Sequence, residues 1–210
     1  YWYAMEPLAD VDPKRALALG LSAGEKIPIL KEYMIRRIGA GDPKKSLSLL
    51  VDGLKDAKDD ATRLTFLRGM NESLKGRKEV PMPEGWTQVA AELAKGDNLE
   101  IRFQSAVVSV SLGDAKAADS LTGMITDEKA ALAFRKQAIQ TLARLQSPPL
   151  VPVLHTLLAD AELRADALRA LASFDDAKSP AAILAVYEKL SPTERRDALA
   201  TLCSRVGYAK

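Results

Sequence analysis

The sequence has few of the residues that build disulfides, metal sites and catalytic triads. Its 210 residues include one cysteine, Cys203, and one histidine, His155. A lone cysteine cannot form a disulfide within the chain, and metal sites and Ser-His-Asp triads need several partners at defined spacing. Glycine-rich phosphate loops and nucleophile elbows are missing as well. We therefore expect that the chain is not an enzyme and holds no catalytic, metal or cofactor site.

Each of the two rare side chains has a structural interpretation. His155 lies between Leu154 and Leu157 in an apolar helical pattern, with no Cys, Asp or Glu four residues later. We interpret it as a structural histidine. Cys203 directly follows Leu202, so we expect a small buried side chain there, because a reactive thiol needs a base or a helix N-terminus close by.

Aromatic residues, excess charge and long apolar runs are also scarce. The 5% of aromatic residues favours close helix–helix packing over a β-sandwich. Thirty basic and 28 acidic residues leave a formal charge of +2, which argues against nucleic acid as the partner. Charges interrupt every apolar run before about 18 residues, so no membrane span is expected. The chain begins Tyr1-Trp2-Tyr3 with no signal peptide, and we expect it to be a fragment of a longer chain.

What the sequence does contain is a repeat. Six segments have apolar residues at their fourth, fifth and eighth positions, and the fourth positions are Met34, Phe66, Ala106, Ala138, Ala167 and Ala198. The intervals between them are 32, 40, 32, 29 and 31 residues. Such spacing places the apolar residues on one stripe of an α-helix. A second helical pattern precedes each stripe, with a short polar turn between; Ser191 is a candidate N-cap after one such turn.

A helix hairpin of about 30 residues cannot bury its apolar face alone, whereas stacked hairpins can. We therefore predict an all-α fold, an α-solenoid of about six helix-hairpin repeats that spans residues 1–210 as one array. The long interval contains residues 75–85, whose two prolines and two glycines predict an inserted loop. The simpler interpretation of this loop is a tolerated surface excursion, and the alternative is a marker of the functional face.

The motif Arg-x-x-Ala-[Leu/Ile]-x-x-Leu, present at 135–142, 164–171 and 195–202, resembles the HEAT and lyase-type HEAT-like repeat family. A narrower resemblance is carried by residues 1–8 (YWYAMEPL), 34–38 (MIRRI) and 74–86 (LKGRKEVPMPEGW). These are similar to the HEAT-repeat segment of large planctomycete-type haem-binding proteins. Members of that family have a glucose/sorbosone dehydrogenase-like propeller before the repeats and a c-type cytochrome domain after them. The resemblance implies a spacer arm in an exported redox protein, periplasmic or at the cell surface. The Cys-x-x-Cys-His signature is absent here, so this piece would carry no haem.

A basic residue recurs at the first position of five repeats: Lys31, Arg63, Arg135, Arg164 and Arg195. This column is our candidate interaction surface, a ladder of positive charge that binds phosphates or an acidic partner. The favoured alternative is structural, with each side chain bonded to carboxylates and helix ends in adjoining turns. Carboxylates stand in those turns, at Asp60, Asp127, Asp160 and Glu194.

Trp2 and Trp86 are candidate aromatic contacts, because exposed tryptophans commonly anchor a partner. For Trp2, packing on the first repeat is the alternative. We predict a non-catalytic protein-interaction or inter-domain scaffold, whose partner is another domain of the parent chain or another protein. The alternatives are a HEAT-like nucleic-acid-binding protein that uses a basic concave face, and a HEAT-like lyase or chaperone. An array cut from its neighbours exposes an apolar face at each end, which predicts weak self-association.

Overall fold

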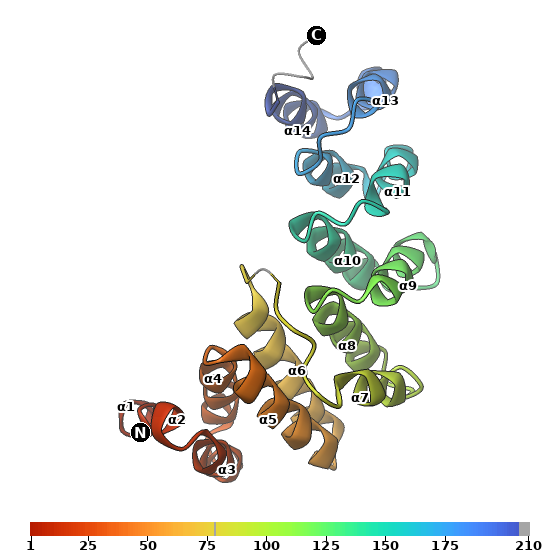
Figure 1. Cartoon of the computed structure of the whole chain (residues 1–210). Helices are drawn as coiled ribbons and strands as arrows, with labels where there is room; N and C mark the ends of the chain where they lie inside the picture. The colour runs from red at the N-terminus through yellow and green to blue at the C-terminus, as the bar shows by residue number, and fades with distance from the viewer. Residues whose placement is uncertain (78, 206–210) are drawn as a thin grey trace. The chain divides into compact units, whose positions relative to one another are not determined.

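The computed structural model describes residues 1–77 and 79–205 (Figure 1). Every regular element within these residues is a helix, which confirms the prediction of an all-α chain. The chain divides into two compact units, Tyr1–Ala115 and Lys116–Lys210. The helices of the first unit are α1 (Trp2–Met5), α2 (Leu8–Val11), α3 (Pro13–Ala23), α4 (Pro28–Gly39), α5 (Pro43–Asp56), α6 (Asp60–Leu74), α7 (Trp86–Leu93) and α8 (Leu99–Ser111). Those of the second are α9 (Ala115–Thr126), α10 (Leu132–Arg144), α11 (Leu150–Leu157), α12 (Arg164–Leu171), α13 (Ser179–Val186), the short 3₁₀ helix η1 (Tyr187–Lys189) and α14 (Pro192–Cys203).

Short polar side chains begin several of these helices. The Asp42 carboxylate accepts a hydrogen bond from the backbone N–H of Lys45 at 3.0 Å, ahead of a proline at the first position of α5. Asp59 caps α6 in the same way, and hydrogen bonds from the backbone N–H and the hydroxyl of Thr62 lower the pKa of that carboxyl. Ser191 and Glu194 form a reciprocal capping box on α14, which confirms the predicted N-cap.

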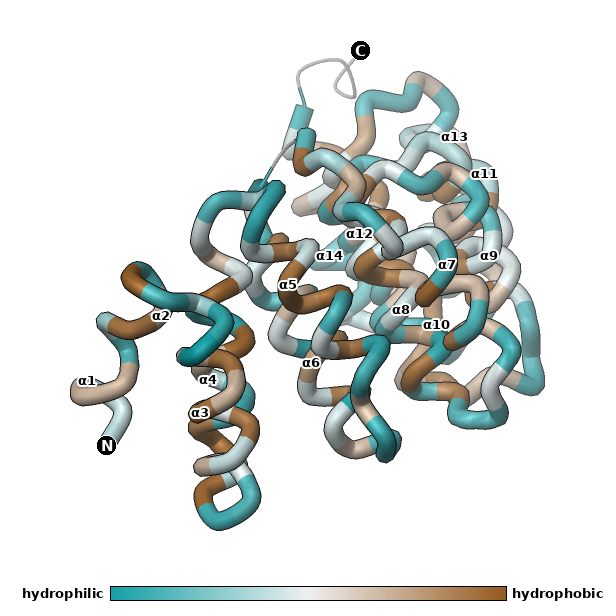
Figure 2. Tube along the Cα trace, turned by 60° about the horizontal axis from the view of Figure 1, so that its bottom comes forward, coloured by the Kyte–Doolittle hydropathy of each residue, from teal (hydrophilic) through white to brown (hydrophobic). Residues whose placement is uncertain are grey.

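The core of the first unit contains buried residues from α3 to α8, including the apolar stripes of α4 and α6. α4 packs against α3, α5 and α6, and α6 also packs against α8. Glycines allow α4 and α6 to approach closely, because a Cβ at Gly69 would lie 2.5 Å from Cγ2 of Ile35. Figure 2 shows hydrophobic and hydrophilic residues alternating within each turn along α5 and α6, as expected for helices with one buried face.

In α8 the buried stripe differs from the predicted one. Ala106 and Val110 are only half-buried, whereas Gln104 and Val108 are buried. The physical reason is that α8 packs against both α6 and α7 and its buried polar side chains have partners on them. The side-chain N–H of Asn71 on α6 donates to the Gln104 side-chain oxygen at 2.7 Å. A pattern of apolar residues cannot reveal a stripe that contains a paired glutamine.

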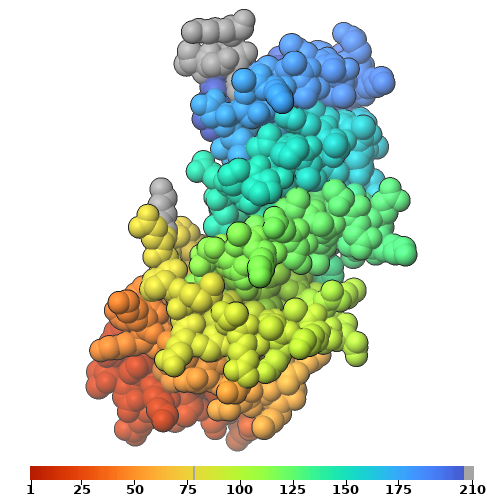
Figure 3. Space-filling view, turned by 45° about the vertical axis from the view of Figure 1, so that its right-hand side comes forward, coloured from red at the N-terminus to blue at the C-terminus, as the bar shows by residue number. Residues whose placement is uncertain are grey.

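In the second unit α12 packs against α10, α11 and α14. The stripes of α10 and α12 are buried as predicted, from Ala138 to Leu142 and from Ala167 to Leu171. On α14 Ala198 is buried, but Leu199 is 49% exposed. In the space-filling view the colours of this unit follow one another in bands, so successive segments are neighbours on that face (Figure 3).

Residues 75–85, with Lys78 outside the described part of the chain, contain no helix and join α6 to α7. Gly76 and Gly85 have φ angles of 75° and 77°, which glycine adopts without strain. Val80 is buried in the core of the first unit, and the Arg77 guanidinium donates to the carbonyls of Ala40 and Gly41. The loop is therefore fixed at two points, by Val80 in the core and by Arg77 at the end of α4.

Candidate interaction surfaces

In the second unit the three arginines of the basic column bind the ends of helices. Nε of Arg135 donates to the Ile125 carbonyl at 2.8 Å, and Nε of Arg164 donates to the Leu158 carbonyl at 2.7 Å. A guanidinium nitrogen of Arg195 donates to the Glu188 carbonyl at 3.1 Å. Each of these carbonyls belongs to the end of the helix that precedes the arginine, where carbonyls lack helical partners.

Two of these arginines also contact a carboxylate about 25 to 30 residues further along the chain. A guanidinium nitrogen of Arg135, a residue only 7% exposed, lies 3.2 Å from the Asp160 carboxylate. A guanidinium nitrogen of Arg164 lies 3.8 Å from the Glu194 carboxylate. The contacts therefore join one pair of helices to the next. These contacts all lie within the chain. They do not test whether the basic column also binds a partner, so that role stays a prediction.

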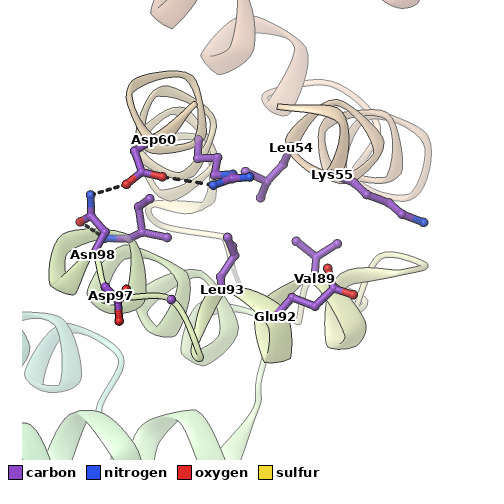
Figure 4. A pocket seen from close by; sticks show the side chains of 11 residues that line it. Leu54, Lys55, Asp60, Val89, Glu92, Leu93, Asp97 and Asn98 are labelled. Carbon is purple, nitrogen blue, oxygen red and sulfur yellow. Dashed lines mark hydrogen bonds and ion pairs between the residues drawn. The ribbon is translucent and has the colours of Figure 1, made fainter. Parts of the chain in front are cut away.

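The two members of the column in the first unit lie at the surface. The Lys31 ammonium is 3.4 Å from the Thr62 hydroxyl, between the starts of α4 and α6. Arg63 lines a pocket of about 380 Å³ between α5 and α6 on one side and α7 and α8 on the other (Figure 4). There the Asp60 carboxylate accepts from Arg63 at 3.1 Å and from the Asn98 amide at 2.9 Å. The side chains of this polar edge are therefore bonded to one another. The other side of the pocket has the apolar Leu54, Val89 and Leu93, with Lys55 and Glu92 next to them (Figure 4).

The two tryptophans have different environments. Trp2 is half-buried and meets the edge of the Tyr33 ring, with centroids 5.4 Å apart, beside a small crevice that Arg36 and Arg37 also line. Trp86 is 1% exposed, and its indole N–H donates to the Ser109 hydroxyl at 2.9 Å. Trp2 is thus accessible to a partner, whereas Trp86 fills the core between α7 and α8.

Exposed large apolar side chains are concentrated in the first 33 residues of the described part of the chain. Seven of the eleven exposed large hydrophobic residues in the described part of the chain are Tyr1, Tyr3, Val11, Leu19, Ile27, Ile29 and Tyr33. Tyr1, Tyr3 and Val11 are 92%, 88% and 81% exposed. Only the three-dimensional placement of α1 to α4 distinguishes these side chains from core residues of similar type.

A Ser-His-Asp cluster joins α11 to the start of α13. Nε2 of His155 lies 3.0 Å from the Ser179 hydroxyl and 3.3 Å from the Asp176 carboxylate. The Ser179 hydroxyl donates to the Asp176 carboxylate at 2.9 Å, so both residues lie on the Nε2 side of the His155 ring. A catalytic triad instead has the aspartate on Nδ1 and the serine on Nε2. This geometry fits the structural role that we inferred for His155, although its partners 21 and 24 residues away were not foreseen.

Cys203 and the acidic side chains give no sign of a metal site. The expectation that Cys203 is buried is wrong, because the thiol is exposed. α14 contacts α12 through Ala198 and Thr201, and Cys203 points from a different face of the helix. Within residues 1–77 and 79–205, no three His, Cys, Asp or Glu side chains come together as metal ligands. In the same part of the chain, no helix has both the length and the apolar character needed to cross a bilayer.

Comparison of the sequence with protein-family models and with curated proteins finds no match. The resemblance to HEAT-type repeats therefore rests on the repeated sequence motif alone. The function has to be inferred from the surfaces described above.

Proposed function

We propose that the chain is a HEAT-like α-solenoid and that it acts as a non-catalytic interaction scaffold between protein domains. The solenoid is supported by polar contacts that recur between alternate helices. On the first unit Arg68 pairs with Glu100, and on the second Arg169 donates to Asp197 at 2.8 Å. The Thr201 hydroxyl donates to the Leu168 carbonyl at 2.7 Å. The partners of these bonds are 28 to 33 residues apart, close to the sequence repeat.

The observation that supports an interaction role is the gathering of exposed apolar side chains on α1 to α4. Seven of the eleven exposed large hydrophobic residues of the described chain fall within the first 33 residues, and apolar surface of this kind marks an interaction site where it is contiguous. Tyrosine and tryptophan are also the side chains that contribute most to protein interfaces. We infer that a partner covers Tyr1, Tyr3 and Val11, the most exposed of these side chains. The resemblance to haem-binding proteins makes a neighbouring domain of one exported redox polypeptide the proposed partner.

Nucleic acid is less well supported as a partner. Arg68, Arg135 and Arg169 are already paired with carboxylates. Burial lowers the pKa of Arg169, but hydrogen bonds to Asp166 and Asp197 more than offset this and raise it. An arginine that is paired with a carboxylate contributes little to phosphate binding, since the carboxylate already neutralises its charge.

The test is affinity capture from a cell-envelope extract combined with cross-linking. The chain with Tyr1→Ser, Tyr3→Ser and Val11→Ser is compared with a control that replaces three exposed leucines, Leu99→Ser, Leu184→Ser and Leu199→Ser. We expect the first variant to lose the partner and the control to retain it, with cross-links on α1 to α4. Equal capture by both variants, or substrate turnover by the purified chain, would contradict the proposal.

A further inference from the structure

An open groove of about 1280 Å³ runs between α3 and α5 in the first unit. Its volume exceeds the roughly 300–1,000 Å³ of ordinary small-molecule sites. The floor is closely packed, because a Cβ at Gly53 would lie 2.7 Å from the Phe66 ring and 3.3 Å from the Leu17 side chain. Above this floor, Ala18, Leu21 and Leu49 line the apolar walls. We call this feature the α3–α5 groove.

The two walls of the α3–α5 groove run in the same direction. Gly20 in α3 and then Gly24 just after it lie against Met34 and then Lys31 of α4, so the residue order runs in opposite directions. Gly39 and Gly41 at the end of α4 lie in the same way against Leu50 and then Ser46 of α5. Each of α3 and α5 is therefore antiparallel to α4, and the two are parallel to each other. The beginnings of both helices consequently lie at one end of the groove.

Charge is distributed unevenly along the α3–α5 groove. At the end where its helices begin, the charged lining residues are Lys14 and Lys45. At the other end the charges are mixed, and the residues are Glu25, Lys31, Asp52, Lys55, Asp56, Lys58 and Asp59. The lining is therefore positive at the lysine end and nearly balanced at the far end. The Asp12 and Asp42 carboxylates that cap α3 and α5 are not part of this lining and accept hydrogen bonds from backbone N–H groups of their own helices.

Lys14 and Lys45 differ from three arginines that join neighbouring segments of the chain. Arg37, Arg68 and Arg169 are each paired with a carboxylate of a neighbouring helix, at Asp10, Glu100 and Asp197. In the described part of the chain, by contrast, the Lys14 and Lys45 ammonium groups make no hydrogen bond or ion pair with another residue. Their charge is therefore available to a ligand that enters the groove.

We propose that the α3–α5 groove binds one amphipathic α-helix of a partner protein, antiparallel to α3 and α5, with an acidic last turn against Lys14 and Lys45. Apolar residues at i, i+3, i+4 and i+7 of that helix pack on Leu17, Leu21 and Leu49. The negative end of its helix dipole adds to the attraction of the lysines. This inference rests on the proposed scaffold function and names the partner's chemistry.

The experiment uses a labelled synthetic peptide of about 15 residues, long enough to form a helix, with leucines at that spacing and three glutamates in its last turn. Binding to the 210-residue chain is measured by fluorescence anisotropy and located by NMR shift changes. The double variant Lys14→Glu/Lys45→Glu is compared with Arg15→Glu/Lys44→Glu. The control changes the net charge equally at exposed neighbours on the same two helices, outside the groove lining.

We expect Lys14→Glu/Lys45→Glu to weaken the peptide about tenfold and the control less than about twofold. Ala18→Arg, which places a bulky side chain in the groove from an exposed position, should also abolish binding without unfolding the chain. The inference is overturned by equal loss in both double variants, by equal binding of a peptide with lysines in its last turn, or by no binding at about 1 mM.

The peptide experiment and the partner-capture experiment can fail independently of each other. If the groove variants leave peptide binding unchanged while Tyr1→Ser/Tyr3→Ser/Val11→Ser abolishes partner capture, the groove inference fails and the scaffold proposal stands. If the peptide binds in the groove and no partner depends on α1 to α4, the proposed partner surface fails instead.

Discussion

Arg135 shows how much a single side chain contributes within one helix pair. Its guanidinium is almost fully buried and bonds both the end of α9 and the Asp160 carboxylate. Replacing it by alanine leaves a buried carbonyl without its donor and a half-buried carboxylate without its counter-charge. We expect Arg135→Ala to lower the free energy of unfolding by about 3 kcal/mol in urea denaturation. The exposed Arg144→Ala is the control, and an equal loss there would contradict this assignment.

Glu194 gives the second prediction at this scale, which concerns pH. Hydrogen bonds from the side chain and backbone N–H of Ser191 lower the pKa of Glu194 below its ordinary 4.5, although burial opposes them. The folded state therefore favours the charged form, so the stabilisation is present above about pH 4.5 and lost as the pH falls through the lowered pKa. Glu194→Gln should cost about 1 kcal/mol or less at pH 7. Thermal melts of both proteins should converge in acid, and a constant gap would rule out this origin.

At the scale of elements, the contact between α4 and α6 depends on glycine. Gly69 leaves no room for a Cβ beside Ile35, and both positions lie in the core of the first unit. We expect Gly69→Ala to destabilise the chain by about 1–3 kcal/mol despite the higher helix propensity of alanine. Gly123→Ala on α9, where a Cβ has open space, is the matched control and should be neutral or slightly stabilising. Circular dichroism melts of the two variants measure the difference.

The sequence alone predicts the helices better than the contacts between them. The stripes at Met34, Phe66, Ala138 and Ala167 lie on α4, α6, α10 and α12, because apolar periodicity reports which face of a helix is buried. It could not reveal the paired Gln104 on α8.

The candidate surfaces were harder to predict, because they too depend on contacts between helices. The exposure of Tyr3 and the burial of Trp86 depend on which helix packs beside each residue. The α3–α5 groove likewise depends on the distance between two helices that do not follow each other in the sequence. Composition and spacing contain no information on such distances.

At the scale of the whole molecule, the two compact units predict that stability is not uniform along the chain. Gly69→Ala should lower the protection of amide hydrogens mainly in residues 1–115, and Arg135→Ala mainly in residues 116–205. Hydrogen exchange followed by mass spectrometry reports both effects in one experiment. Loss of protection spread evenly over the chain in either variant would show a single cooperative structure instead.

The arginine links of the second unit also bear on how such a chain changes length in evolution. Arg135 bonds the helix end before it and the Asp160 carboxylate beyond it, and Arg164 does the same with Leu158 and Glu194. If one helix pair is duplicated, the new copy contains an arginine that can bond the carboxylate of the next pair. It also contains a carboxylate that can bond the arginine of the pair before it. The coding sequence can therefore gain or lose whole pairs without leaving a buried charge unpaired, whereas a deletion of half a pair would break the chain of links.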